Sequence, residues 1–134
     1  MEIIMSKNWK SKGLELNGSY KCLRNSHLST IIVEGITYPS VEHAFQASKV
    51  SERAVKFQIS KASLAEVRNL LEDIWIRPNW NDVKYATLHQ LVKLKFESNK
   101  ELANVLIGTG TQLLGNKNEA ELGSILMKVR SEIA

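Results

Sequence analysis

The sequence predicts a helix-rich α+β domain with a small antiparallel hairpin, on three observations. Apolar residues recur at helical spacing over much of the chain. β-Branched and aromatic residues cluster instead at residues 31–33 and 36–38, around the turn pair Glu34-Gly35. A length of 134 residues, with 43% hydrophobic and 24% charged residues, is ordinary for one globular domain, here residues 1–134.

The first elements in chain order are short. Residues 14–18 read as a strand running into a turn, and Glu34-Gly35 suits a two-residue hairpin. Pro39 cannot continue a helix from its amino side, and Ser40 after it is a good N-cap. We therefore expect a helix from residue 41, with one small or apolar face suited to a core, formed by Val41, Ala44, Phe45 and Ser48.

A second face of this helix carries Glu42, Gln46 and Lys49, one turn apart, which we call the polar stripe. Spaced charges of this kind are common on the solvated flank of an amphipathic helix. Glu42 also gains from the helix dipole in the first turn, with or without a function. The alternative is that an acid, an amide and a cation beside a buried surface hold a polar ligand.

Further helices follow down to the end of the chain. Ser63 and Glu66 form a capping-box pattern, Pro78 breaks an irregular segment, and Asn81 can cap a long helix. On that helix Lys95 lies at the edge of the apolar stripe, where it either snorkels outward or faces an internal polar cavity. The expected helices cover residues 52–59, 64–71, 82–97, 101–107 and 119–133.

Composition narrows the compartment and the partners. No apolar run reaches the 18 or so residues needed to span a bilayer, and the first 13 residues lack the pattern of a secretory signal. Cys22 is the single cysteine, which fits a reducing cytoplasm. A net charge of +4 with a pI near 9.2 favours small anionic ligands such as nucleotides or sugar phosphates, with no basic tract for nucleic acid.

Several kinds of chemistry find no support in the residues. The three histidines, His27, His43 and His89, have no partners at zinc-ligand spacing, and Cys22 is better explained as an idle thiol than as a nucleophile. The glycines at residues 108–110 form neither a dinucleotide fingerprint nor a P-loop, and no nucleophile elbow is present. What remains is a carboxylate with lysines and arginine around a phosphate-bearing ligand.

Four stretches, in order along the chain, carry a resemblance to the NADAR (YbiA-like) family. Residues 34–49 are similar to its signature, a β-turn followed by an S/T-x-E-H-x-x-Q-A-x-K helix. Residues 77–81 with 94–96 resemble its R-x-D-W run and the K-F that ends its long helix. Residues 106–110 resemble its L-L-x-T-G, and residues 122–130 its L-G-x-x-L-M-x-V-R.

The resemblance implies a small helix-rich α+β domain that cleaves N-glycosidic bonds without a metal or organic cofactor. Family members hydrolyse early intermediates of riboflavin synthesis or remove ADP-ribose from modified guanine. The expected ligand is therefore a small anionic nucleotide or sugar phosphate, and ADP-ribosylated nucleic acid is a further candidate partner. Nothing in the sequence indicates a membrane or an oligomeric state.

The matching positions also imply roles for individual residues. Glu42 is the signature carboxylate, and a carboxylate stabilises the positive charge that develops on the sugar or takes a proton from water. Asn25 aligns with a ribose-binding asparagine, and Trp80 either stacks on a base or walls the pocket. Phosphate or the leaving group is assigned to Lys49, Arg77 and Lys95, and further ligand contacts to Arg24, Tyr38, His43 and Gln46.

The chain departs from the family pattern at three places, and the first and the last of them favour a second hypothesis. Arg24 replaces a serine, Asn79 replaces an aspartate, and residues 115–121 contain no W-G-D-x-x-W-G segment, which normally supplies part of the active site. The first hypothesis is an N-glycosyl hydrolase. The alternative is a binding module that has lost catalysis and sequesters or senses an NAD-derived nucleotide, and a purely structural role is a third possibility.

Overall fold

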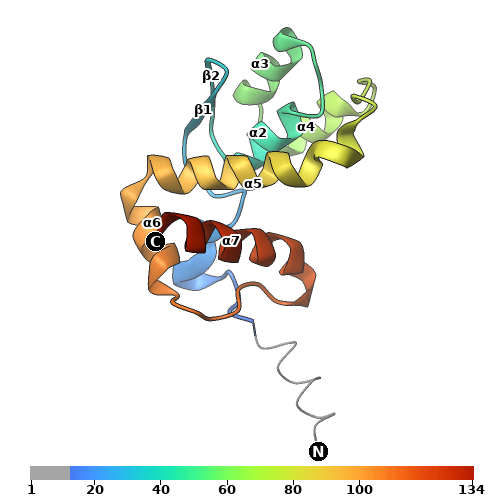
Figure 1. Cartoon of the computed structure of the whole chain (residues 1–134). Helices are drawn as coiled ribbons and strands as arrows, with labels where there is room; N and C mark the ends of the chain where they lie inside the picture. Colours follow the sequence, from blue (N-terminus) through green and yellow to red (C-terminus); the bar gives the residue numbers. More distant parts are fainter. Residues whose placement is uncertain (1–12) are drawn as a thin grey trace, which may run out of the picture. The chain divides into compact units, whose positions relative to one another are not determined.

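The structure is a computed structural model that describes residues 13–134, which form two compact units (Figure 1). One unit combines residues 13–24 with residues 99–134, and the other comprises residues 25–98. The predicted helix-rich α+β class is confirmed, whereas the single domain stays a prediction. The expected lack of a secretory signal concerns the start of the chain, which lies outside the described residues.

The hairpin in the unit of residues 25–98 forms as predicted. Strand β1 (Ile31–Val33) pairs antiparallel with β2 (Ile36–Tyr38), and Ile31 stands opposite Tyr38. Glu34 and Gly35 both have positive φ angles, 52° and 81°, as a type I′ turn requires. The register turns the side chain of Tyr38 inward, and it is only 2% exposed.

Helix α2 (Val41–Ala47) begins where the sequence predicts. The hydroxyl of Ser40 accepts a hydrogen bond from the backbone N–H of His43 at 3.2 Å, which is the expected N-cap. Its apolar face is buried at Val41, Ala44 and Ala47, whereas Phe45 and Ser48 of the predicted core face are half-buried.

Two short helices and one long helix complete this unit. They are α3 (Arg53–Lys61), α4 (Leu64–Leu71) and α5 (Trp80–Ser98). Ser63 and Glu66 form both hydrogen bonds of the predicted capping box at the start of α4. Helix α5 buries the predicted apolar stripe together with Lys95, on a face made of Leu88, Leu91, Val92, Lys95 and Phe96.

The predicted cap of the long helix is wrong. Asn81 lies inside the first turn, because α5 already begins at Trp80. The backbone carbonyl of Asn79 accepts hydrogen bonds from the N–H groups of Asp82 and Val83, at 3.0 and 3.3 Å, so helical bonding starts two residues before the expected cap.

The other unit contains two helices and two short 3₁₀ turns. Helices α6 (Lys100–Gly108) and α7 (Ala120–Ile133) pack together, while the turns are η1 (Gly18–Leu23) and η2 (Lys117–Glu119). The strand expected at residues 14–18 is reduced to an isolated bridge between Leu14 and Leu114, and η1 follows it.

Close contacts explain two of the quoted motifs in this unit. A Cβ atom at Gly123 would overlap the carbonyl oxygen of Leu114, so the glycine of the L-G pair is required for α7 to approach this closely. Arg130 donates from Nη1 to Oγ1 of Thr109 at 2.8 Å and to the carbonyl of Gln112 at 2.9 Å. These motifs therefore hold the unit together.

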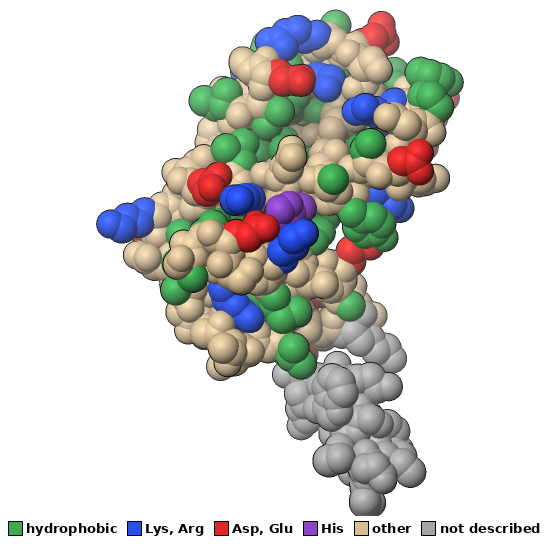
Figure 2. Space-filling view, in the orientation of Figure 1, with side chains coloured by type: hydrophobic (Ala, Val, Ile, Leu, Met, Phe, Trp, Pro, Cys, Tyr) green, Lys and Arg blue, Asp and Glu red, His purple; other side chains and the backbone are tan. Residues whose placement is uncertain are grey.

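The described residues were compared with what membrane spans, metal sites and basic tracts require. No helix within residues 13–134 combines the length and apolarity needed to cross a bilayer. The same residues contain no group of three or more His, Cys, Asp or Glu side chains placed to hold a metal ion. Basic and acidic side chains are interspersed on the face seen in Figure 2, in keeping with a net charge of +4 that is not concentrated in a tract.

Candidate functional site

The polar stripe of α2 lines a cleft of about 460 Å³, which we call the α2–α4 cleft. Its opposite wall comes from α4 and the segment that follows it. That volume lies within the range of small-molecule sites, about 300–1,000 Å³. The cleft is lined by Glu42, Gln46, Lys49, Leu64, Val67, Arg68, Leu71, Glu72 and Ile76.

Hydrogen bonds hold both the backbone and the side chain of Glu42 in position. Its backbone N–H donates to the carbonyl of Asn25 at 2.9 Å, which satisfies one of the N–H groups left unpaired at a helix start. Its carboxylate oxygen Oε2 accepts a hydrogen bond from Nε2 of Gln46 at 2.6 Å. Because Glu42 and Gln46 lie one helical turn apart, Gln46 holds one carboxylate oxygen of Glu42, and the second oxygen can contact a ligand.

The cleft also carries two cations on facing helices. Lys49 follows the end of α2, and Arg68 extends from α4, where it shares a face with the apolar side chains of Leu64, Val67 and Leu71. Sequence analysis did not select Arg68. The available signal was its position four residues after Leu64 on a predicted amphipathic helix, which places it at the edge of the buried face.

Tyr38 and Arg77 lie at another cavity, of about 210 Å³, bounded by the hairpin, α2, α3 and α5. We call it the hairpin–α5 cavity. None of its lining residues is shared with the α2–α4 cleft. The structure therefore brings together Glu42, Gln46 and Lys49, but it does not bring Tyr38 and Arg77 into the same hollow.

Arg77 fastens the end of α2 to the segment before α5. Its backbone N–H donates to the carbonyl of Lys49 at 2.9 Å, and Nη1 donates to the carbonyl of Ser48 at 3.4 Å. Its Nε donates to Oδ1 of Asn79 at 2.9 Å. Asn79, which stands where the resembled motif has an aspartate, thus still accepts from the arginine, but without a charge.

His43 and Trp80 make contacts that support the fold. The His43 ring is buried, with Nδ1 at 2.7 Å from the hydroxyl of Ser40 and Nε2 at 2.8 Å from the carbonyl of Ala62. A ligand could bind this imidazole only by replacing one of these bonds. Trp80 packs against Phe45, with ring centroids 5.1 Å apart and planes tilted by 54°, and it lines neither the α2–α4 cleft nor the hairpin–α5 cavity.

Lys95 and Asn25 are the other predicted site residues in this unit. Lys95 is 1% exposed, so it does not snorkel outward, and it is absent from both sets of lining residues. Burial, and next the charge of Lys95, lower the pKa of His27. The side-chain oxygen of Asn25 is buried and has no hydrogen-bond partner among the described residues, and Asn25 is also absent from both sets of lining residues.

Arg24 belongs to the unit that contains α6 and α7, where its guanidinium has several partners. Nε donates to the carbonyl of Leu16 at 2.7 Å, and Nη2 lies 3.2 Å from Oδ1 of Asn17. Nη2 also forms an ion pair with Glu119 at 2.6 Å. An anionic ligand would compete with this carboxylate for Arg24.

Comparison with known proteins identifies the family. The model of the NADAR domain matches residues 6–120, which is most of the chain. This chain belongs to the NADAR domain family.

Named relatives of this NADAR chain fall into two groups. N-glycosidase YbiA of Shigella boydii serotype 4 (strain Sb227) is 31% identical, over 78% of this chain and 76% of that protein. A riboflavin biosynthesis protein of Vibrio vulnificus (strain YJ016) is 30% identical over 83% of this chain. The chain corresponds to 35% of the length of the Vibrio protein.

A solved structure supports the same assignment. The NMR structure of the Escherichia coli protein YbiA superposes with a TM-score of 0.76 and 26% identity, covering 90% of this chain and 82% of that one. The NADAR fold thus extends over nearly the whole chain, in a family whose named relatives include N-glycosidases.

Proposed function

We propose that this NADAR protein is an N-glycosidase that hydrolyses the bond between C1′ and a base nitrogen in a ribosyl-phosphate or ADP-ribosyl compound. The observation that carries the proposal is the α2–α4 cleft, in which the Glu42 carboxylate, held by Gln46 at 2.6 Å, lies with Lys49 and Arg68. Two relatives, one named N-glycosidase and one named riboflavin biosynthesis protein, support N-glycosidase activity in general.

The proposed reaction needs a negative charge close to the sugar. As the C1′–N bond breaks, its electron pair stays on the base nitrogen and positive charge develops on the sugar ring. Glu42 stabilises that charge and accepts a proton from the attacking water, whose oxygen bonds to C1′. The products are the free base, which gains a proton at nitrogen, and the sugar phosphate.

The remaining lining residues suit the other parts of the substrate. Lys49 and Arg68 neutralise phosphate, and only the arginine can bind two phosphate oxygens in a planar fork. The apolar side chains of Leu64, Val67 and Leu71 offer a wall for the base. Asn25 does not line the cleft and acts on it through its backbone carbonyl, which accepts a hydrogen bond from the N–H of Glu42.

A substrate panel tests this reaction. The purified chain is incubated with early riboflavin-pathway intermediates and with nucleic acid carrying ADP-ribosylated guanine, and released sugar phosphate or ADP-ribose is measured by mass spectrometry. Release from one substrate class, above a reaction without protein, identifies that class as the substrate. If neither class is cleaved although ADP-ribose or the intermediates bind, the hydrolase proposal is wrong.

A binding module without turnover is the second candidate, and one observation favours it. Residues 115–121 form only the short turn η2 and the start of α7, and the carboxylate of Glu119 in this segment is paired with Arg24 at 2.6 Å. Glu119 is the one acidic residue of η2, so this turn offers no carboxylate that is not already engaged in an ion pair. Calorimetry with ADP-ribose tests this candidate, which requires binding at micromolar to millimolar ligand without product formation.

A further inference from the structure

The hairpin–α5 cavity is a polar hollow that the proposed reaction leaves unused. Four elements enclose it, and the side chains that reach it include a phenol, a hydroxyl, an amide and two cations. It is lined by Val33, Glu34, Tyr38, Ala44, Ser48, Lys56, Arg77, Thr87, Gln90 and Leu91.

Tyr38 brings a phenol to the wall of this cavity. Its side chain is 2% exposed and lines the cavity, while its hydroxyl is not among the buried polar atoms that lack a partner. A phenol can donate one hydrogen bond. The hydroxyl of Tyr38 is therefore a candidate donor to a ligand that enters the cavity.

Two cations lie on the walls around Tyr38. Lys56 reaches in from α3, and its Nζ lies 3.8 Å from a carboxylate oxygen of Glu34. Arg77 uses Nε and Nη1 for Asn79 and Ser48, which leaves the N–H groups of Nη2 for another acceptor. A lysine, an arginine and a phenol together suit an acceptor that is negatively charged.

We propose that the hairpin–α5 cavity binds a small oxyanion, namely inorganic phosphate or the phosphate group of a sugar phosphate, through Tyr38, Lys56 and Arg77. This site is separate from the α2–α4 cleft, because the two share no lining residue. It does not depend on the proposed hydrolysis, and a phosphate bound there also steadies Arg77, whose backbone N–H holds the carbonyl of Lys49.

The size of the cavity favours a small ion over a whole nucleotide. Its 210 Å³ equals the share of liquid volume of about seven water molecules. Pockets for drug-sized ligands start at about 300 Å³. A phosphate with part of its hydration, or with a fragment of sugar, is therefore the occupant that fits.

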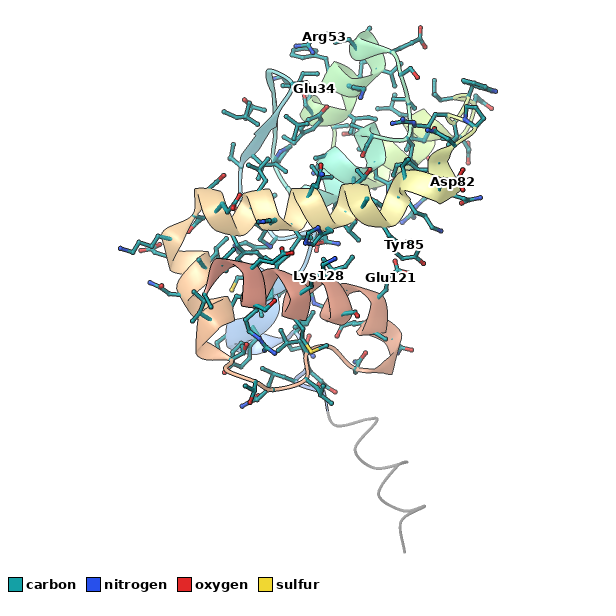
Figure 3. All side chains as sticks on the ribbon, in the orientation of Figure 1. Glu34, Arg53, Asp82, Tyr85, Glu121 and Lys128 are labelled. Atoms are coloured by element: carbon teal, nitrogen blue, oxygen red, sulfur yellow. The ribbon has the colours of Figure 1, made fainter. Side chains whose placement is uncertain are left out.

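The negative charge of Glu34 opposes anion binding in the cavity, which provides a further test. Its carboxylate is at the hairpin turn, where Figure 3 labels it close to Arg53 of α3, and its backbone carbonyl accepts from Arg53 at 2.8 Å. The side chain is 70% exposed, so water screens its charge in part. An anion in the cavity competes with Glu34 for Lys56, and removing the Glu34 charge should strengthen binding.

Phosphate titrations of single variants test the site. Inorganic phosphate and ribose 5-phosphate are titrated by ³¹P NMR and calorimetry against the wild-type chain, Tyr38→Phe, Lys56→Ala and Glu34→Gln. We expect Tyr38→Phe to weaken binding roughly tenfold through loss of one hydrogen bond to a charged group. Lys56→Ala should weaken it about threefold or more, and Glu34→Gln should tighten it about twofold or more.

Matched controls exclude general effects of the substitutions. Tyr20→Phe removes a phenol from η1, and Lys61→Ala removes a cation from α3 at a position that does not line the cavity. Both should leave the phosphate affinity unchanged. Thermal melting of each variant verifies that the fold persists. Glu34→Gln is expected to raise the phosphate affinity, and partial unfolding would not produce such an increase.

The outcomes of these titrations distinguish the phosphate site from the proposed hydrolysis and show which compound supplies the phosphate. Ribose 5-phosphate that binds more tightly than inorganic phosphate, with an affinity that Tyr38→Phe lowers, identifies a sugar phosphate as the occupant, and equal affinities identify free phosphate. Absence of phosphate binding at millimolar concentration overturns the proposal. So does binding that Lys49→Ala abolishes and Tyr38→Phe leaves intact, whereas lack of hydrolysis has no bearing on it.

Discussion

The two hollows that border α2 differ in what their walls contain. The α2–α4 cleft has about 460 Å³ and a carboxylate, Glu42, fixed by Gln46 within the hollow. The hairpin–α5 cavity has about 210 Å³, and its carboxylate, Glu34, is 70% exposed at the hairpin turn. Each hollow has two cations. The cleft therefore has the groups for chemistry on a sugar, whereas the cavity has the groups for holding an anion.

The difference follows from helical periodicity. Residues 42, 46 and 49 fall on one face of α2 and its extension, whereas Ala44 and Ser48 turn toward the hairpin and α5. One short helix thus serves two hollows that share no side chain. Changes in the polar stripe should affect the cleft alone, and changes in Tyr38 or Lys56 the cavity alone.

The largest expected effect is that of Glu42→Gln on hydrolysis. Loss of the carboxylate should lower kcat by about 10²–10⁴-fold, the usual contribution of a general base or of charge stabilisation. Folding should persist, because the amide retains the shape of the side chain and Ser40 still caps the helix. Single-turnover product release checks the rate, and phosphate affinity at the hairpin–α5 cavity should not change.

The matched control for this substitution is Glu52→Gln. Glu52 is an exposed carboxylate before α3 in the same unit, and its side chain makes no cap hydrogen bond. It should retain full activity while making the same change in net charge. A large loss of thermal stability in Glu42→Gln, but not in Glu52→Gln, would make Glu42 a structural residue instead.

Ser40→Ala should damage both hollows, because both are built on α2. The substitution removes the N-cap and leaves Nδ1 of the buried His43 ring without its partner at 2.7 Å. We expect the free energy of unfolding to fall by about 2 kcal/mol. Urea unfolding measures this loss, and Ser63→Ala, which uncaps the more exposed α4, should cost about 1 kcal/mol. Equal losses would mean that the His43 contact adds nothing.

Local signals in the sequence predicted much of this arrangement. The Glu34-Gly35 turn, the Ser40 cap and the Ser63 capping box were all placed correctly, because each depends on residues close in sequence. The cap at Asn81 was wrong because the carbonyl of Asn79 starts the helix earlier. Short-range pattern cannot reveal such a shift when two asparagines are available.

The division of the predicted site residues could not be foreseen. Spacing on one helix groups Glu42, Gln46 and Lys49, but the positions of Arg77 and Tyr38 depend on how α5 and the hairpin pack around α2. Arg68 entered the cleft for the same reason, through the packing of α4 on α2. Tertiary contacts of this kind have no signature in a single sequence.

Lys49→Ala and Arg68→Ala should weaken substrate binding at the cleft by about 3- to 10-fold each. Each removes one charge-assisted contact to phosphate, at a site where solvent screens part of the charge. The Michaelis constant should rise more than kcat falls. Arg53→Ala, on α3 and outside the cleft, is the control. If both variants keep the wild-type KM, the phosphate does not bind between α2 and α4.

Titration of Tyr38 should report the state of the hairpin–α5 cavity. Burial, followed by the charge of Glu34, raises the pKa of this phenol above its ordinary value of 10.0, against the opposing effect of Arg53. The chain has three tyrosines, so a difference absorbance titration of wild type against Tyr38→Phe isolates this one. Bound phosphate should raise its pKa further, since the phenolate and the anion repel each other.

The sign of the stability effect follows from the same shift. The folded state retains the Tyr38 proton at a pH where the unfolded chain has lost it, so this contribution to stability is full below pH 10.0 and declines above it. Tyr38→Phe should flatten that part of the alkaline unfolding curve. A Tyr38 that titrates at or below 10.0 would contradict a buried phenol.

The smallest expected effect concerns Glu66, which supports only the α2–α4 side. Hydrogen bonds from the backbone and side chain of Ser63 lower the pKa of this carboxyl below 4.5, against a weaker opposing effect of burial. The contribution of Glu66 to the free energy of unfolding is therefore present above pH 4.5 and is lost as the pH falls through the pKa of the folded state. Glu66→Gln should reduce the acid sensitivity of α4 while leaving the hairpin–α5 cavity, and its phosphate affinity, unchanged. Acid titration followed by NMR of the α4 amides checks this, and parallel loss of α4 and of the hairpin would show that the two sides of α2 do not open independently.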